Sequence, residues 1–232
     1  IQAIPVTPEQ DAAYMAAVAL REYDAVVAAH TNADGSRKAG WMLAPNGKPT
    51  NLTERQWVQV RTPRFKEWFG DWEHDPKHAS KVVDENGEPR VVYHGTRASF
   101  NTFDTSRFGQ TDRGMYGQGI YLTPMREYAE AYGEPMPLFA SVRNPVSVGA
   151  YGETPSIKQA SGATGAAAIT QALREKGHDG VWMPDPWAAE VVAFDPAQVK
   201  SATGNTGAFD AGDKDIRYSI QAIPVTPEQD AA

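Results

Sequence analysis

The stretch that decides the fold class is GMYGQGIYLT, residues 114–123. Its three glycines permit a tight backbone path into a strand that starts near Gly119. They do not form a dinucleotide-binding fingerprint, because a strand rather than a helix N-terminus follows them. Tyr121 in the strand and Tyr132 at the end of the next helix could form two walls of a slot for a flat ring, since aromatic faces stack on such rings. A tyrosine-rich core is the alternative interpretation.

Short β-like runs alternate with turns on both sides of this stretch. We predict strands at 90–93, 119–122, 138–142, 180–183 and 190–194, and helices at 124–132 and 163–176. Several short strands with only two helices among them indicate an α+β domain rather than a doubly wound parallel sheet.

The N-terminal part of the chain has a helical pattern. Thr7, Pro8 and Gln10 form a helix opening with a capping box, and apolar spacing predicts a helix up to about His30. A loop should follow, with a short hairpin around Pro45-Asn46-Gly47. A second helical stretch is predicted over 53–70, and the aromatic side chains at its end are expected to form a packing face.

We therefore divide the chain into four parts. They are an N-terminal helix and loop extension (1–52), a helical, aromatic-rich lead-in (53–87), a core (88–201) and an irregular tail (202–232). The thirteen residues IQAIPVTPEQDAA at 1–13 recur unchanged at 220–232, which chance cannot produce. A linker, a processing site and a helix start used twice all remain open. Because the chain starts at Ile1, we expect a processed product or a piece of a larger polypeptide.

Composition excludes several classes of protein. Hydrophobic residues make up 41% and charged residues 22%, which is typical of a globular chain rather than a disordered one. The formal net charge of −7 lacks the basic footprint of a nucleic-acid binder. Without cysteine there are no disulfides, thiol nucleophiles or thiolate metal sites. No apolar run approaches the roughly 18 residues of a membrane helix, so we expect no membrane partner.

Two further segments could carry chemistry. His94 ends a predicted strand and precedes Gly95, whose bare backbone can approach a ligand closely. A lone histidine is more often structural than catalytic. Glu190 leads directly into an apolar strand, where desolvation of a carboxylate is expensive. It is therefore either an exposed strand start or a functional carboxylate.

A metal site is not expected. His74 and His78 are four residues apart, a spacing that can hold zinc on one helical face. Asp75-Pro76 between them disfavours a continuous helix, and no third ligand is evident. We interpret this segment as a solvated loop.

Together, three motifs resemble one family. HGT at 94–96, YGQGIYL at 116–122 and EVVAFDPAQV at 190–199 resemble the signatures of ADP-ribosyltransferases of the His-Tyr-Glu class, which includes diphtheria toxin and the poly(ADP-ribose) polymerases. RFKEWFGDW at 64–72 and DIRYS at 215–219 are similar to ADP-ribosyltransferase domains embedded in phage and mobile-element polyvalent proteins. The resemblance implies a split β-sandwich around an NAD cleft, with an N-terminal helical extension.

The resemblance also implies roles for particular residues. Glu190, His94 and Tyr121 would be catalytic: Glu190 would bond the nicotinamide ribose, His94 the adenosine ribose, and Tyr121 would stack on the nicotinamide ring. Gly95 would hold the nicotinamide carboxamide through its backbone. The residues implied to bind NAD⁺ are His94, Gly95, Thr96, Tyr121, Tyr132 and Arg113. Arg113, together with Arg97 and Arg107 of the same loop, could contact the pyrophosphate.

The chain departs from the family's patterns at two positions. Ala129 stands where the polymerases carry a serine, so one carboxamide hydrogen bond should be absent. Ala188 stands where arginine-specific members carry a second acidic residue, which argues against arginine as the acceptor.

The expected function is that of a mono-ADP-ribosyltransferase. It would use NAD⁺ as substrate, without a metal, and modify a macromolecular acceptor, protein rather than nucleic acid. It would act as a phage or mobile-element effector or toxin in the cytoplasm of a bacterial host or target cell. The alternatives are an NAD⁺ glycohydrolase and a catalytically silent binding module of the same fold.

Overall fold

A computed structural model describes residues 7–109, 113–148, 154–183 and 189–217. Ala188, the C-terminal copy of the repeat and the first six residues of the N-terminal copy lie outside these ranges. Within them, no helix has the length and apolar character needed to cross a membrane.

Two β-sheets form the centre of the molecule. The first has the strand order β1-β3-β7 and is antiparallel throughout, with β1 at Val92–Thr96, β3 at Glu134–Ala140 and β7 at Val199–Ser201. The second has the order β2-β6-β5-β4, with β2 at Ile120–Leu122, β6 at Glu190–Ala193, β5 at Gly180–Met183 and β4 at Pro145–Ser147. Only the β4–β5 pair is parallel. The predicted α+β fold is confirmed.

Alternate residues of the strands build the apolar layer between the sheets. In β3, Leu138 belongs to this layer while its neighbour Phe139 belongs to a cluster on the outer face. In β2, Ile120 and Leu122 enter the layer, and Tyr121 packs against the cluster on the other side. This alternation follows from the two-residue period of a strand. Each sheet therefore has a second face that needs a cover.

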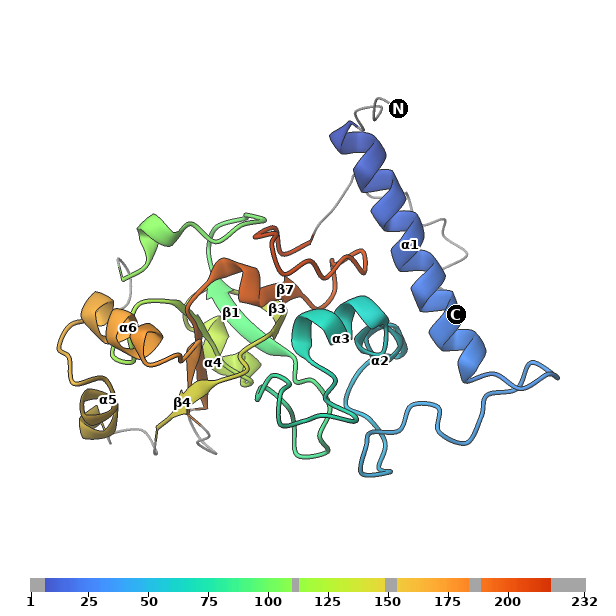
Figure 1. The fold of residues 1–232 in the computed structure, drawn as a ribbon, viewed down its shortest axis with the longest axis horizontal. Helices are drawn as coiled ribbons and strands as arrows, with labels where there is room; N and C mark the ends of the chain where they lie inside the picture. Colours follow the sequence, from blue (N-terminus) through green and yellow to red (C-terminus); the bar gives the residue numbers. More distant parts are fainter. Residues whose placement is uncertain (1–6, 110–112, 149–153, 184–188, 218–232) are drawn as a thin grey trace.

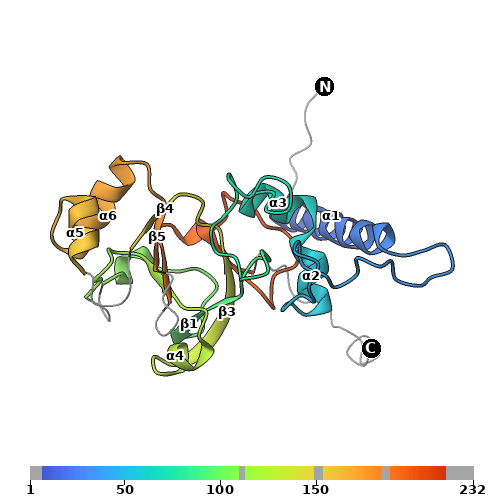
Figure 2. The same cartoon turned by 90° about the horizontal axis from the view of Figure 1, so that it is seen from below.

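Helices cover both outer faces. Ile169 and Leu173 of α6 (Ala166–Glu175) pack with Val181 and Val192 on the four-stranded sheet, and α5 (Thr154–Ser161) lies beside α6. At the other end of the molecule lie α1 (Pro8–Ala29), α2 (Glu54–Val60) and α3 (Pro63–Phe69), as Figures 1 and 2 show. The layers run helices, sheet, sheet, helices.

The helical stretch predicted over 53–70 is two helices, not one. Thr62 caps α3 by accepting a hydrogen bond from the Phe65 N–H, and Pro63 occupies the first helical position. Proline has no N–H with which to continue α2, so the chain must restart there. The predicted capping box of α1, Thr7 with Gln10, is confirmed.

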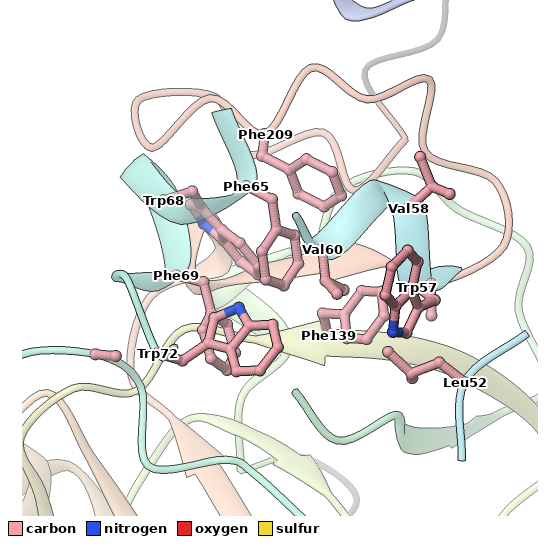
Figure 3. Packing of buried hydrophobic residues seen from close by; sticks show 12 residues of the cluster. Leu52, Trp57, Val58, Val60, Phe65, Trp68, Phe69, Trp72, Phe139 and Phe209 are labelled. Atoms are coloured by element: carbon pink, nitrogen blue, oxygen red, sulfur yellow. The ribbon is translucent and has the colours of Figure 1, made fainter. Parts of the chain in front are cut away.

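The predicted aromatic packing face is confirmed as well. Phe65 is fully buried, with ring centroids 4.8 Å from Phe209, 5.0 Å from Phe69 and 5.3 Å from Phe139. Figure 3 shows these rings gathered between α2, α3 and β3. Phe209 comes from the tail, which has no helix or strand between residues 202 and 217, as predicted.

Other boundaries differ from the predictions. β5 begins and ends where expected, whereas β4, β7 and α5 were not predicted, and neither were the short 3-10 turns Thr105–Arg107 and Pro196–Gln198. α4 is shorter than expected (Arg126–Glu130). The expected hairpin near residue 46 is present as a Leu43–Pro49 bridge.

β3 starts four residues before its predicted start. Pro135 and Pro137 argue against a strand there, since proline cannot donate to a ladder. The strand tolerates them because they lie opposite Gly95 and Tyr93, whose backbone groups point away from β3.

Candidate active site

One cleft of about 800 Å³ is bounded by β1 and β2, close to the bridge that joins the two sheets. It brings together residues that are far apart in the sequence. The predicted site residues that line it are His94, Gly95, Thr96, Tyr121, Tyr132 and Glu190. Residues from the loop after β1, the helix α4 and the start of β6 complete its walls.

Tyr121 and Glu190 lie on the same face of the four-stranded sheet. β2 pairs with β6 so that Tyr121 lies opposite Val192. Residues directly opposite share a face, and side chains two apart along a strand do so too. Glu190, two residues before Val192, therefore points to the same side as Tyr121. Both side chains are half-buried.

The hydroxyl of Tyr121 is tied to the glycine-rich loop that precedes its own strand. It donates to the carbonyl of Gly117 at 2.7 Å and accepts from the N–H of Tyr116 at 3.1 Å. These bonds fix the direction of the ring. The loop therefore sets the orientation of the aromatic face at the cleft.

His94 is held from β2 by a single backbone group. Its Nδ1 lies 2.9 Å from the carbonyl oxygen of Tyr121, which can only accept, so Nδ1 carries the hydrogen. Burial lowers the pKa of His94, and the Tyr121 carbonyl only partly opposes this effect. The neutral ring consequently presents Nε2 as an acceptor. Phe103 packs edge-on against the imidazole, with ring centroids 5.0 Å apart.

The backbone of Gly95 is directed towards the cleft. Tyr93 exchanges two backbone hydrogen bonds with Thr123, of 2.7 and 3.0 Å, which join the two sheets. Backbone groups two residues apart on a strand point to the same side. The N–H and C=O of Gly95 therefore point away from β3, on the side where the chain leaves β2 at Thr123 and turns into α4.

The missing side chain of Gly95 serves helix packing. A Cβ there would lie 2.0 Å from the carbonyl oxygen of Ala129 and 2.8 Å from the Cβ of Tyr132. The glycine thus lets α4 pack directly on β1, which brings Tyr132 to the cleft. The side chain of Tyr132 remains 50% exposed, and its ring centroid lies 5.8 Å from that of Tyr128. The expectation from sequence had been that this glycine allows close approach of a ligand.

The remaining predicted residues contribute differently. The Thr96 hydroxyl accepts a hydrogen bond from the Ala98 N–H at 3.1 Å, so it shapes the loop after β1. Arg113 is exposed and does not line the cleft. Two other arginines of this region, Arg97 and Arg107, do line it.

Part of the cleft wall could not be anticipated from sequence. Phe100, Phe103 and Phe108 line the cleft from the loop that follows β1. The motifs that resemble the family do not include them. Phe100 and Phe103 also pack edge-on against His94, with ring centroids 6.4 and 5.0 Å from that of the imidazole.

The expectation of a solvated loop around His74 and His78 is consistent with their side-chain exposures of 74% and 73%. Asp71, Glu73 and His74 are the one group with metal-compatible spacing among the residues that the structure describes. Their carboxylates already hold cations, since Lys66 lies 3.2 Å from Asp71 and 2.6 Å from Glu73.

Comparison with known protein families gives one match. Residues 84–209 match the family described as "ADP-Ribosyltransferase in polyvalent proteins". The matched region is 126 residues (209 − 84 + 1) of a chain of 232, which is more than half. It contains both sheets and the whole cleft lining. No curated protein shows a significant match.

Proposed function

The chain belongs to the ADP-ribosyltransferases of polyvalent proteins, and on that premise we propose that it moves single ADP-ribose units from NAD⁺ to a macromolecular acceptor. The observation that carries the proposal is the convergence of His94, Tyr121 and Glu190 on one cleft. Its volume of about 800 Å³ is in the range of ligand pockets, which is roughly 300–1,000 Å³.

In this proposal the nicotinamide end of NAD⁺ binds between β1 and β2. The ring stacks on Tyr121, whose direction is fixed by the bonds of its hydroxyl. The carboxamide pairs with Gly95, accepting from its N–H and donating to its C=O. Tyr132 closes the slot from α4. Because Ala129 has no hydroxyl, no side-chain bond from that position assists the carboxamide.

Glu190 stabilises the transition state for loss of nicotinamide. The bond between C1′ of the ribose and the pyridinium nitrogen breaks, and its electron pair leaves with nicotinamide. Positive charge then develops on the ribose, and a fixed carboxylate that bonds the 2′-hydroxyl stabilises this charge more than the ground state. The acceptor's nucleophile forms the new bond to C1′ and releases its proton to the solvent. A preorganised group of this kind contributes about 3 kcal/mol.

His94 binds the adenosine ribose as a neutral acceptor. With Nδ1–H donated to Tyr121, its Nε2 can accept a hydrogen bond from a ribose hydroxyl. The hydroxyl of Thr96 holds the loop that follows β1 through its bond to Ala98. We assign the pyrophosphate to Arg97 and Arg107, because they line the cleft and Arg113 does not.

We propose that the acceptor is a protein and that the modified residue is not an arginine. Ala188 takes the place of the second acidic residue that arginine-specific members carry. A net charge of −7 disfavours a nucleic-acid acceptor. We further propose that the chain is part of a larger phage or mobile-element protein and acts as an effector or toxin in bacterial cytoplasm.

Transfer can be tested with NAD⁺ labelled in the adenosine ribose and a bacterial extract. We expect label on material that protease digests and nuclease does not, with nicotinamide released in proportion. Nuclease-sensitive label would overturn the protein acceptor. Free ADP-ribose without labelled macromolecules would indicate an NAD⁺ glycohydrolase instead. If NAD⁺ is neither bound nor consumed, the chain is a silent module and the proposal fails.

A further inference from the structure

The glycine-rich loop that orients Tyr121 rests directly on α6, on the outer face of the four-stranded sheet. A Cβ at Gly114 would lie 2.5 Å from the Cβ of Ala166, and one at Gly117 would lie 2.6 Å from Oγ1 of Thr170. Both glycines also have positive φ, at 65° and 107°. These glycines are therefore required by close packing on the helix.

One peptide unit of this loop is held from both ends by hydroxyl groups. The carbonyl of Gly117 accepts from the Tyr121 hydroxyl at 2.7 Å. The N–H of the same peptide, that of Gln118, donates to the Thr170 hydroxyl at 2.6 Å and to the Ala166 carbonyl at 3.1 Å. Because a peptide is planar, fixing its N–H fixes the direction of its carbonyl. Thr170 thereby influences the orientation of Tyr121.

Thr170 uses its hydroxyl outside its own helix. A threonine within a helix commonly donates to the carbonyl one turn back. Here the hydroxyl donates to the carbonyl of Gln118 at 2.9 Å instead, and the side chain is 6% exposed. Threonine is also a poorer helix former than alanine or leucine. The residue serves the loop rather than the helix.

The side chain of Gln118 extends the connection to the opposite wall of the cleft. Its Nε2 donates to the carbonyl of Phe108 at 3.0 Å, and Phe108 lines the cleft. Neither Thr170 nor Gln118 lines the cleft itself. Hydrogen bonds therefore run from α6 through Gln118 to Tyr121 on one side and to Phe108 on the other.

We propose that Thr170 and Gln118 are positioning residues for the nicotinamide subsite. They act through Tyr121 and through Phe108 in the loop that follows β1. The inference rests on the proposed function, because it takes the Tyr121 ring to be the surface on which nicotinamide stacks. A misdirected ring would weaken binding of substrate and transition state alike. Such a change raises KM and leaves kcat nearly unchanged.

The test compares the full chain with Thr170→Val, which removes the hydroxyl at nearly constant shape, and with Thr170→Ser, which keeps it. For Thr170→Val we expect the KM for NAD⁺ and the dissociation constant of nicotinamide, measured by calorimetry, to rise by about three- to tenfold. The Ala166 carbonyl keeps part of the bond to Gln118, so the loss is partial. Thr170→Ser should restore both values to within about twofold of the wild type.

Thr62→Val is the matched control. Thr62 is buried like Thr170, and its hydroxyl donates to the carbonyl of Gln59 at 2.8 Å, but it lies at the start of α3. It should lower stability without changing nicotinamide binding. Equal shifts in the control and in Thr170→Val would overturn the inference, as would wild-type binding in Thr170→Val.

Gln118→Glu provides a second variant should Thr170→Val not fold. Glutamate has no Nε2–H with which to donate to the Phe108 carbonyl, so we expect the same rise in KM and in the nicotinamide constant; unchanged values would overturn the inference. Failure of the proposed function looks different. In that case the wild type binds nicotinamide without consuming NAD⁺. A wild type that neither binds nicotinamide nor consumes NAD⁺ contradicts the proposed function and this inference together.

Discussion

Two groups of aromatic side chains in this molecule have opposite environments. The rings on the outer face of the three-stranded sheet, Phe65, Phe139 and Phe209 among them, are almost wholly buried, and Phe65 packs edge-on against the other two (Figure 3). At the cleft, Tyr121 is half-buried and Tyr132 half-exposed. The first group excludes water on every side. The rings of the second group stay partly exposed although the backbone that carries them is held by hydrogen bonds and packing. A binding site for a flat ring requires this arrangement.

The largest expected effect lies in the packed group. Phe65→Ala should lower the free energy of unfolding by about 3–5 kcal/mol, because it leaves a cavity among rings that cannot collapse into it. Urea denaturation would measure the loss. The folded fraction should keep its KM for NAD⁺. A loss below about 1 kcal/mol would mean that this cluster does not carry the fold's stability.

Glu190→Gln should give the reverse result, a large loss of activity at nearly unchanged stability. The transition state loses its carboxylate, so kcat should fall by a hundredfold or more, equivalent to about 3 kcal/mol. The shape of the side chain is retained, and the residue is only half-buried at a strand start. NAD⁺ consumption and thermal unfolding would be recorded on the same preparation. Full activity in the variant would remove Glu190 from the mechanism.

A smaller difference between the two regions is expected in how the free energy of unfolding depends on pH. Burial holds the pKa of His94 below its ordinary value of 6.5. The unfolded chain therefore takes up a proton near pH 6.5 before the folded chain does, and stability falls as the pH drops below that value. The slope from one proton is at most about 1.4 kcal/mol per pH unit, and it ends once the folded histidine is protonated too.

His94→Asn isolates this contribution, because its amide can still donate to the Tyr121 carbonyl but does not titrate. Unfolding at pH 7.5 and pH 5.5 should show a smaller difference in the variant than in the wild type. Phe65→Ala should retain the wild-type difference. Equal differences in wild type and His94→Asn would show that His94 is not held neutral.

The smallest expected effect is that of chelation. Asp71, Glu73 and His74 lie beyond α3, away from the cleft, and their carboxylates hold Lys66. Dialysis against EDTA should leave both NAD⁺ consumption and the melting temperature unchanged. A loss that zinc or magnesium restores would contradict the assignment of this site to ion pairing.

Sequence patterns predicted elements best where local signals agreed. β5 was placed correctly because an apolar run is bounded by clear turns on both sides. The break between α2 and α3 was missed although Thr62-Pro63 repeats the Thr7-Pro8 signal that correctly marked the start of α1. The early start of β3 could not be predicted, because its prolines are acceptable only in the register that it adopts beside β1.

The candidate site was predictable in part. Motifs identified the residues that meet in the cleft. They did not show why position 95 must be a glycine, because the atoms that exclude a side chain there belong to α4. Whether Arg97, Arg107 or Arg113 lines the cleft depends on the path of the loop after β1. That path depends on bonds between distant segments, such as the one from Gln118 to Phe108, which no local pattern reveals.

A crystal structure of the full chain with NAD⁺ would test the central claim most directly. We expect the nicotinamide ring on the face of Tyr121, its carboxamide paired with the backbone of Gly95, and the 2′-hydroxyl of its ribose within hydrogen-bond distance of Glu190. An NAD⁺ molecule bound away from the cleft between β1 and β2, or nicotinamide placed away from Tyr121, would contradict the account.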